Sequence, residues 1–143
     1  GEDPTMTRTC QALVMLCAAG LHMPAFAGEG EGLIARYTAE ARAADPAFAG
    51  FSAARGETLH RSRHGGGKPD TPACTSCHGE DARTAGRTRA GKAIEPMAVS
   101  VSPTRYTDAA KVEKWFKRNC TEVLGRECTA REKGDWLAWM MKQ

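Results

Sequence analysis

Apolar side chains recur at helical spacing near both ends of the chain. Near the start, one helical face carries Leu33, Ile34, Tyr37 and Ala41. The dipeptide Asp45-Pro46 then ends this predicted helix. A second helical stretch runs roughly from residue 52 to residue 63 and stops at the triple glycine 65–67.

The C-terminal third predicts two more helices. Thr107 is placed to N-cap a helix that continues to about Arg118. Thr129 and Glu132 form a capping box that opens a last helix, which extends to Lys142. The apolar content of that helix is Trp136, Leu137, Trp139, Met140 and Met141. Between these pairs of helices, residues 79–105 are polar, contain glycine and proline, and show no alternation typical of a sheet.

The first residues read as a leader. Residues 1–5 look like a cloning remnant, and residues 6–27 have the basic start, the short apolar run and the small-x-small end of a signal peptide. We expect cleavage after Ala27, a mature domain of residues 28–143, and export to the periplasm, which is an oxidising compartment. The apolar run of about ten residues is too short to cross a bilayer, so no membrane span is expected in the mature chain.

Composition and charge further limit the class of protein. The 143 residues carry a formal charge of +3, with 41% hydrophobic and 26% charged residues, which is ordinary for one soluble domain. The basic excess is weak and forms no run, so nothing indicates nucleic-acid binding.

Six cysteines fall into three pairs along the chain. Cys10 and Cys17 belong to the leader. Cys74 and Cys77 form the motif Cys-Thr-Ser-Cys-His, in which two thiols attach a haem covalently and His78 is an axial ligand of the iron. A thioredoxin-like site would need a βαβ unit, and a zinc site would need a second ligand pair of suitable spacing. Neither is visible, so the motif predicts one covalent haem c.

The second axial ligand is open at this level. Met97 lies in a loop-like stretch, and methionine is the usual sixth ligand of small electron carriers, although it also serves as an apolar contact. Asn119 is the other candidate, because it shares a helical face with Val112, Trp115 and Phe116. On the residues alone, its amide is better explained as a helix C-cap than as an iron ligand.

Other residues are interpreted by position alone. His60 and His64 stand in a polar stretch and are expected to be exposed. Gly56 would allow the second helix to approach Trp136 or Trp139 closely. Candidate partners of haem propionates are Lys68, Arg89, Lys92, Arg105 and Tyr106.

The stretch from Gly66 onward resembles the sphaeroides haem protein family of oxygen-binding c-type cytochromes, and also their relative cytochrome c″. The resemblance rests on residues 67–72 before the Cys74–His78 motif, followed by residues 88–94, 107–108 and 112–115. It continues with Arg118-Asn119-Cys120, residues 124–128, Glu132-Lys133 and residues 137–139. Residues 28–63 match more loosely.

The resemblance implies an all-α, class I-like cytochrome c fold with an extra N-terminal helix and the covalent haem in the core. It implies His78 and Asn119 as axial ligands, since cytochrome c″ carries histidine at the position of Asn119. It also implies a disulfide between Cys120 and Cys128, and it places Met97 where relatives carry a non-ligating aliphatic residue.

The implied function is a periplasmic monohaem cytochrome that takes part in electron transfer and binds O₂, NO or CO when reduced. An amide oxygen is a hard, weak ligand that suits ferric iron, so reduction is expected to release Asn119. Expected partners are other c- or b-type cytochromes, and a dedicated enzymatic activity is not expected. The alternative is a plain electron shuttle ligated by His78 and Met97.

Overall fold

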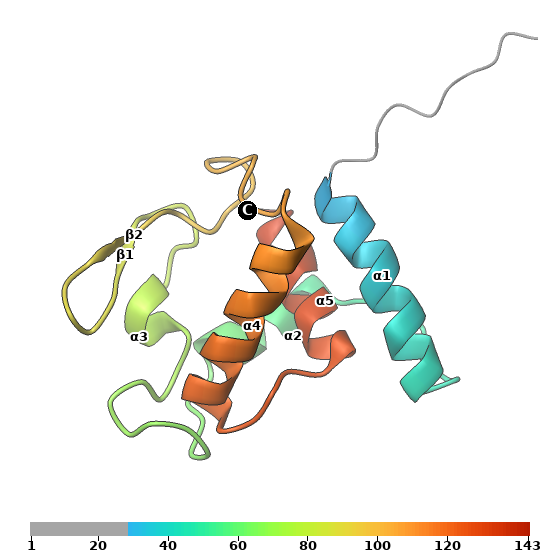
Figure 1. Ribbon diagram of the computed structural model, residues 1–143, viewed down its shortest axis with the longest axis horizontal. Helices are drawn as coiled ribbons and strands as arrows, with labels where there is room; N and C mark the ends of the chain where they lie inside the picture. Colours follow the sequence, from blue (N-terminus) through green and yellow to red (C-terminus); the bar gives the residue numbers. More distant parts are fainter. Residues whose placement is uncertain (1–28) are drawn as a thin grey trace, which may run out of the picture.

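The computed structural model describes residues 29–143, and in this part of the chain the fold is helical apart from one short hairpin (Figure 1). The helices and strands are α1 (Glu29–Ala44), α2 (Ala53–Arg61), α3 (Thr75–His78), β1 (Gly86–Arg87), β2 (Ala93–Ile94), α4 (Ala109–Leu124) and α5 (Ala130–Met140). The predicted all-α class is confirmed, and α1 is the expected extra N-terminal helix. The signal peptide predicted for residues 6–27 lies outside the described residues.

Helix α1 packs against α5 through its predicted apolar face, where Leu33, Tyr37 and Ala41 are buried. The Tyr37 hydroxyl donates to the Glu113 carboxylate on α4. Lys133 on α5 donates to the other oxygen of the same carboxylate at 2.9 Å. This triad, which we call the α1 clamp, joins α1 to α4 and α5, the last two helices of the chain.

Helices α2 and α5 cross closely because Gly56 has no side chain. A Cβ atom built on Gly56 would lie 2.1 Å from the backbone oxygen of Asp135 and 2.8 Å from the Cα atom of Trp136. Real Cβ atoms do not approach backbone atoms that closely, so only glycine permits this contact. The predicted approach of the second helix to Trp136 is therefore confirmed.

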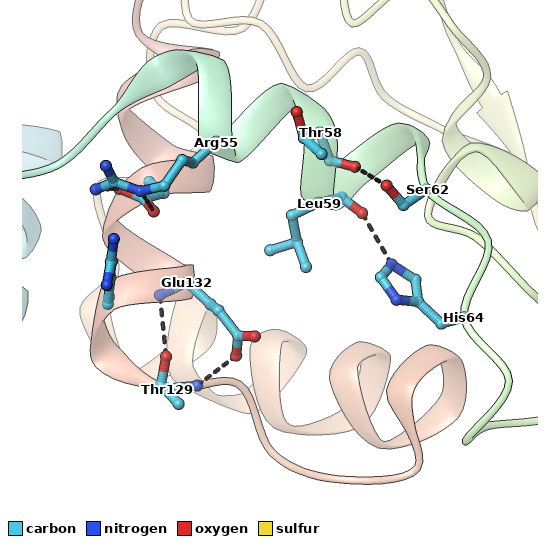
Figure 2. A pocket seen from close by; sticks show the side chains of 9 residues that line it. Arg55, Thr58, Leu59, Ser62, His64, Thr129 and Glu132 are labelled. Atoms are coloured by element: carbon cyan, nitrogen blue, oxygen red, sulfur yellow. Dashed lines mark hydrogen bonds and ion pairs between the residues drawn. The ribbon is translucent and has the colours of Figure 1, made fainter.

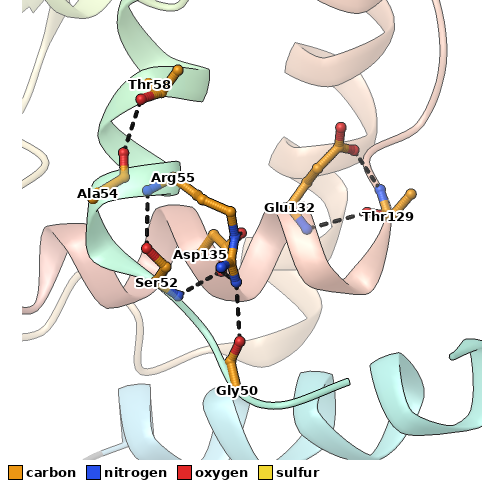
Figure 3. A network of polar contacts seen from close by, with 8 residues as sticks. All are labelled: Gly50, Ser52, Ala54, Arg55, Thr58, Thr129, Glu132 and Asp135. Carbon is orange, nitrogen blue, oxygen red and sulfur yellow. Dashed lines mark hydrogen bonds and ion pairs between the residues drawn. The ribbon is translucent and has the colours of Figure 1, made fainter. Parts of the chain in front are cut away.

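Asp135, which is buried on α5, fixes the start of α2 (Figure 3). Its carboxylate accepts from the backbone N–H of Ser52 at 2.7 Å and from the Arg55 guanidinium at 2.7 and 2.9 Å. Arg55 also donates to the backbone oxygen of Gly50 at 3.0 Å. A buried carboxylate is stable when such donors saturate it, so the network orients α2 on α5.

Helix α4 differs from the predicted helix at both ends. Its N-cap is Asp108 rather than Thr107, and the Asp108 carboxylate accepts from the backbone N–H of Lys111 at 3.0 Å. Its C-terminus is not near Arg118, because the helix continues to Leu124 and ends at Gly125 with a φ of +73°. A left-handed residue of this kind favours glycine and terminates a helix.

The connection between α3 and α4 is mostly irregular, as predicted, but contains the β1–β2 hairpin, which the sequence did not indicate. Ala82 anchors the chain after it, since its carbonyl accepts the N–H groups of Met97 and Ala98, each at 2.9 Å. The core joins this segment to α1, α4 and α5. Within residues 29–143, no helix combines the length and the apolar character that crossing a membrane requires.

Candidate functional site

The Cys74–His78 motif forms one helical turn. Cys74 is the N-cap of α3, and α3 ends at Gly79, whose φ of +72° is open to glycine but costly for other residues. The N–H groups of His78 and Gly79 close the turn on the carbonyls of Cys74 and Thr75 at 3.1 and 3.0 Å. Both thiols and the imidazole are thereby placed on one short, hydrogen-bonded turn.

The thiols of this turn are not activated. Burial raises the pKa of Cys74 to about 11, and burial is also the main reason why the pKa of Cys77 lies above its ordinary value. A redox-active thiol pair needs the opposite shift, because the thiolate is the nucleophile. The βαβ unit that a thioredoxin-like site would require is also absent from residues 29–143. The motif is thus poorly suited to thiol catalysis.

His78 has the ionisation state that a ligating imidazole requires. Burial lowers its pKa to about 4, with further lowering by His60 and Arg105, so the ring is neutral at pH 7. Within the described chain only two buried side-chain atoms lack a hydrogen-bond partner, Nδ1 of His78 and Oγ1 of Thr71. Buried polar atoms are nearly always satisfied, so two exceptions within eight residues around the motif fit a segment built to hold a group from outside the chain.

A metal site made only of protein side chains does not fit the same residues. In residues 29–143, no three His, Cys, Asp or Glu side chains are grouped so that they could hold a metal ion. Structural zinc needs four such ligands. The chemistry of the donor set, two neutral thiols followed by a neutral imidazole, fits covalent haem instead.

The expectation that His60 is exposed is wrong. The side chain is fully buried, and both ring nitrogens are hydrogen bonded. Trp136 Nε1–H donates to His60 Nδ1 at 3.1 Å, and His60 Nε2 bonds to the carbonyl oxygen of Gly79 at 3.2 Å. The helical spacing held the signal that was missed, because His60 lies one turn after Gly56, on the face turned toward α5. His64 is half-buried and bonds to the Leu59 carbonyl at 3.0 Å.

Asn119 does not cap a helix. It lies inside α4, five residues before its last residue, so the C-cap interpretation is wrong. It shares a helical face with Val112, which is buried, and Phe116, which is half-buried, while Trp115 is 43% exposed, contrary to expectation. The half-buried Asn119 amide has no hydrogen bond to any group in residues 29–143. The amide is not among the fully buried unpaired atoms, so part of it is accessible.

The part of α4 that follows Asn119 is held at two places. Cys120 and Cys128 form a disulfide, the pairing that the resemblance implies. The backbone N–H of Lys68, in the loop before the attachment motif, donates to the Glu122 carbonyl at 2.7 Å. Gly67 permits this approach, because a Cβ there would lie 2.1 Å from the same carbonyl oxygen. The attachment loop and the helix of Asn119 are therefore directly joined.

Met97 is a core residue. It is 7% exposed, its N–H donates to the Ala82 carbonyl, and its own carbonyl accepts from the Tyr106 hydroxyl. Tyr106 therefore has its hydroxyl engaged by the backbone, although it was a candidate partner of a propionate. Of the basic candidates, Arg89 pairs with Asp70 at 3.7 Å, and Arg105 lies close enough to His78 to lower its pKa.

An open pocket of about 570 Å³ lies elsewhere, between α2 and the start of α5 (Figure 2). Its lining includes Arg55, Leu59, His64, Thr129 and Glu132. None of the predicted site residues lines it. Several of its polar groups already have partners, as the Thr129–Glu132 capping box shows.

Comparison with known proteins agrees with the chemistry of the motif. A family described as "Domain of unknown function (DUF1924)" matches residues 46–140. The chain is 51% identical to the cytochrome c-type protein SHP of Cereibacter sphaeroides, over 90% of this chain and 97% of that protein. The structure of oxidised SHP, described as an oxygen-binding cytochrome c, has 52% sequence identity and a TM-score of 0.74, with 80% of this chain and 96% of that chain covered.

A second solved relative is more distant. The solution structure of cytochrome c″ from Methylophilus methylotrophus, described as giving insights into haem-ligand detachment, has 31% identity and a TM-score of 0.69. The match covers 80% of this chain and 93% of that one. Both structures therefore share the overall arrangement of helices described above.

Proposed function

This chain belongs to the family of the c-type cytochromes SHP and cytochrome c″, and we propose that it is an exported monohaem protein whose distal ligand leaves on reduction. Its cofactor is haem c. When bound, this group supplies a one-electron couple and, in the ferrous state, a position for O₂, NO or CO. The single observation that carries the proposal is Asn119, which lies within α4 on the face of Val112 and Phe116 and has no hydrogen-bond partner in residues 29–143.

Cys74, Cys77 and His78 hold the cofactor in this proposal. Each thiol would hold the haem by adding its S–H across a vinyl double bond, an addition that would consume no oxidant and leave no unpaired thiol. His78 is the proximal ligand, and its buried, neutral ring suits that role. Because the attachment is covalent, the cofactor stays in place when the opposite ligand is released.

Asn119 is the distal ligand of the oxidised state. An amide oxygen is a hard donor that loses affinity as the iron becomes softer on reduction. Asn119 has no competing hydrogen bond in residues 29–143, so its side chain is free both to ligate and to turn away. The released amide remains nearby on α4 and is able to donate a hydrogen bond to a small diatomic molecule. The descriptions of SHP as oxygen binding and of cytochrome c″ in terms of ligand detachment support this role.

The cysteines indicate the compartment in which the protein works. The Cys120–Cys128 disulfide fits an oxidising compartment, and together with the leader of residues 6–27 it supports export to the periplasm with cleavage after Ala27. Electron-transfer partners there would be other c- or b-type cytochromes. The basic excess of the chain is small, so it does not select among them.

The proposal is tested by absorption spectra of the exported holo-protein before and after reduction with dithionite. We expect a five-coordinate, high-spin ferrous spectrum that changes to a low-spin spectrum on addition of CO. A six-coordinate, low-spin ferrous spectrum that CO leaves unchanged would refute the release of a ligand.

Two matched variants assign the ligand. Asn119→Ala should convert the oxidised protein from low spin to high spin while CO binding to the reduced protein is retained. Met97→Leu removes the rival ligand and should leave both spectra as they are, because Met97 is a core residue. The reverse outcome, with the far-red charge-transfer band of Met–Fe ligation lost only in Met97→Leu, would establish the electron-shuttle alternative.

A further inference from the structure

His60 is the most completely fixed polar side chain near the attachment turn. It is fully buried on α2 and lies between two aromatic rings of α5 and the ring of His78. The ring centroids of His60 and His78 are 6.1 Å apart, and those of His60 and Trp139 are 5.0 Å apart. A histidine buried this deeply normally serves a specific arrangement of hydrogen bonds.

The two hydrogen bonds of His60 determine its tautomer. Trp136 Nε1–H is only a donor, so His60 Nδ1 must accept this bond. The proton of the neutral ring therefore sits on Nε2, where it donates to the Gly79 carbonyl at 3.2 Å. Both bonds are satisfied by one neutral tautomer.

The Gly79 carbonyl belongs to the second peptide after His78, which joins Gly79 to Glu80 where α3 ends with a positive φ. A donor that holds its carbonyl limits rotation of this peptide and, through it, the backbone of His78. The His60 ring also packs beside the His78 ring and restricts the angle at which that imidazole points. The chain from Trp136 through His60 to Gly79 thus transmits the position of α5 to the proximal ligand.

We propose that His60 is a positioning residue that sets the orientation of His78 through its hydrogen bond to the Gly79 carbonyl and its contact with the His78 ring. This inference rests on the proposed function, in which His78 is the proximal ligand. Partners that orient a ligating histidine directly change affinity or activity by about 10–100-fold when removed. Since His60 acts two peptides away, we expect a smaller effect, about 3–10-fold.

The test compares His60→Asn with His60→Gln in the exported holo-protein. Asparagine is too short to reach Gly79, while glutamine places an N–H₂ donor close to the position of Nε2. We expect His60→Asn to shift the Fe–His stretching band of the reduced protein, to move its reduction potential and to change the CO dissociation constant by about 3–10-fold. His60→Gln should return all three toward the values of the unmodified protein.

Arg55→Gln is the matched control, because it weakens the contact between α2 and α5 at Asp135 and leaves the His60 bonds in place. It should lower stability without moving the Fe–His band or the potential. If His60→Asn changes stability only, as the control does, the positioning role is overturned. If the unmodified reduced protein shows no Fe–His band and binds no CO, the proposed function fails instead.

A measurement on the unmodified protein is independent of how the variants fold. Nitrogen-15 NMR of the reduced CO complex should show His60 as the neutral tautomer protonated on Nε2, with slow exchange of that proton. A ring protonated on Nδ1, or a rapidly exchanging Nε2–H, contradicts the proposal.

Discussion

The two sides of the site are constructed differently. On the side of His78, the residues that follow the ligand are held from α2 and α5 by a buried histidine, a buried tryptophan and a crossing of two helices that only Gly56 permits. On the side of Asn119, the helix is held by a disulfide and by one loop contact, but the amide itself has no partner in residues 29–143. In the proposed function, the chain therefore restrains the ligand that stays and only the backbone of the ligand that leaves.

The largest effect is expected from a substitution at Gly56, where α2 and α5 cross on the side of His78. Gly56→Ala would place a Cβ atom 2.1 Å from the backbone of α5, and backbone atoms cannot give way as a flexible side chain can. We expect a loss of about 3 kcal/mol in the free energy of unfolding, the upper end for overpacking. Guanidinium unfolding of the holo-protein measures it.

A second glycine serves as control for that substitution. Gly32 lies in α1, and a Cβ there would meet nothing within 4 Å. Gly32→Ala should leave stability unchanged or raise it by up to about 1 kcal/mol, because alanine is the better helix former. Equal losses in the two variants would show that the crossing at Gly56 is not as tight as described.

The restraint on the side of Asn119 is tested by removing the Cys120–Cys128 disulfide. The double variant Cys120→Ala, Cys128→Ala releases a short loop, and we expect the free energy of unfolding to fall by about 2–3 kcal/mol. If the disulfide also restrains Asn119, the oxidised protein should show a larger high-spin fraction at equilibrium. A stability loss with an unchanged oxidised spectrum would mean that the disulfide only stabilises the domain.

The smallest effect concerns the α1 clamp, which lies away from both ligands. Burial raises the pKa of Glu113, but hydrogen bonds from Tyr37 and Lys133 and the lysine charge outweigh it, so the pKa lies below its ordinary value of 4.5. A depressed carboxyl contributes stability above its unfolded pKa and loses it as the pH falls through the folded pKa.

Glu113→Gln should therefore cost on the order of 1 kcal/mol at pH 7, since the pair is partly exposed and solvent screens it. The difference from the unmodified protein should shrink below pH 4.5, the ordinary pKa of the group. Thermal unfolding at several pH values checks this. A difference that is constant from neutral to acid pH would show that the charge of Glu113 does not act in the clamp.

The sequence predicted the helices well where apolar periodicity and capping chemistry agree, as in α1 and in the Thr129–Glu132 capping box of α5. It failed at the end of α4, because the apolar stripe weakens after Phe116 while the helix is ended only by Gly125. That error made Asn119 look like a cap. It failed at His60 because neighbouring Arg61 and Arg63 suggested a solvated face, although Gly56 one turn earlier marked the buried one.

The haem c cofactor could be predicted from the sequence, because the chemistry of its attachment is contained in five consecutive residues. The loop contact between Gly67 and α4 could not, since it joins residues more than fifty positions apart through backbone atoms. No periodicity reports where such a backbone approach occurs.

The two restraints on α4 that follow Asn119 also bear on how fast this side chain would leave the iron. Because the loop contact and the disulfide hold the helix after it, the amide cannot depart by swinging the end of α4 outward. In the proposed function its departure is then a rotation about side-chain bonds, and such rotations take picoseconds to nanoseconds in exposed side chains, whereas helix and domain displacements take microseconds to milliseconds. A ligand released in this way would follow the arrival of an electron almost at once, and it would return as quickly when the electron is passed on.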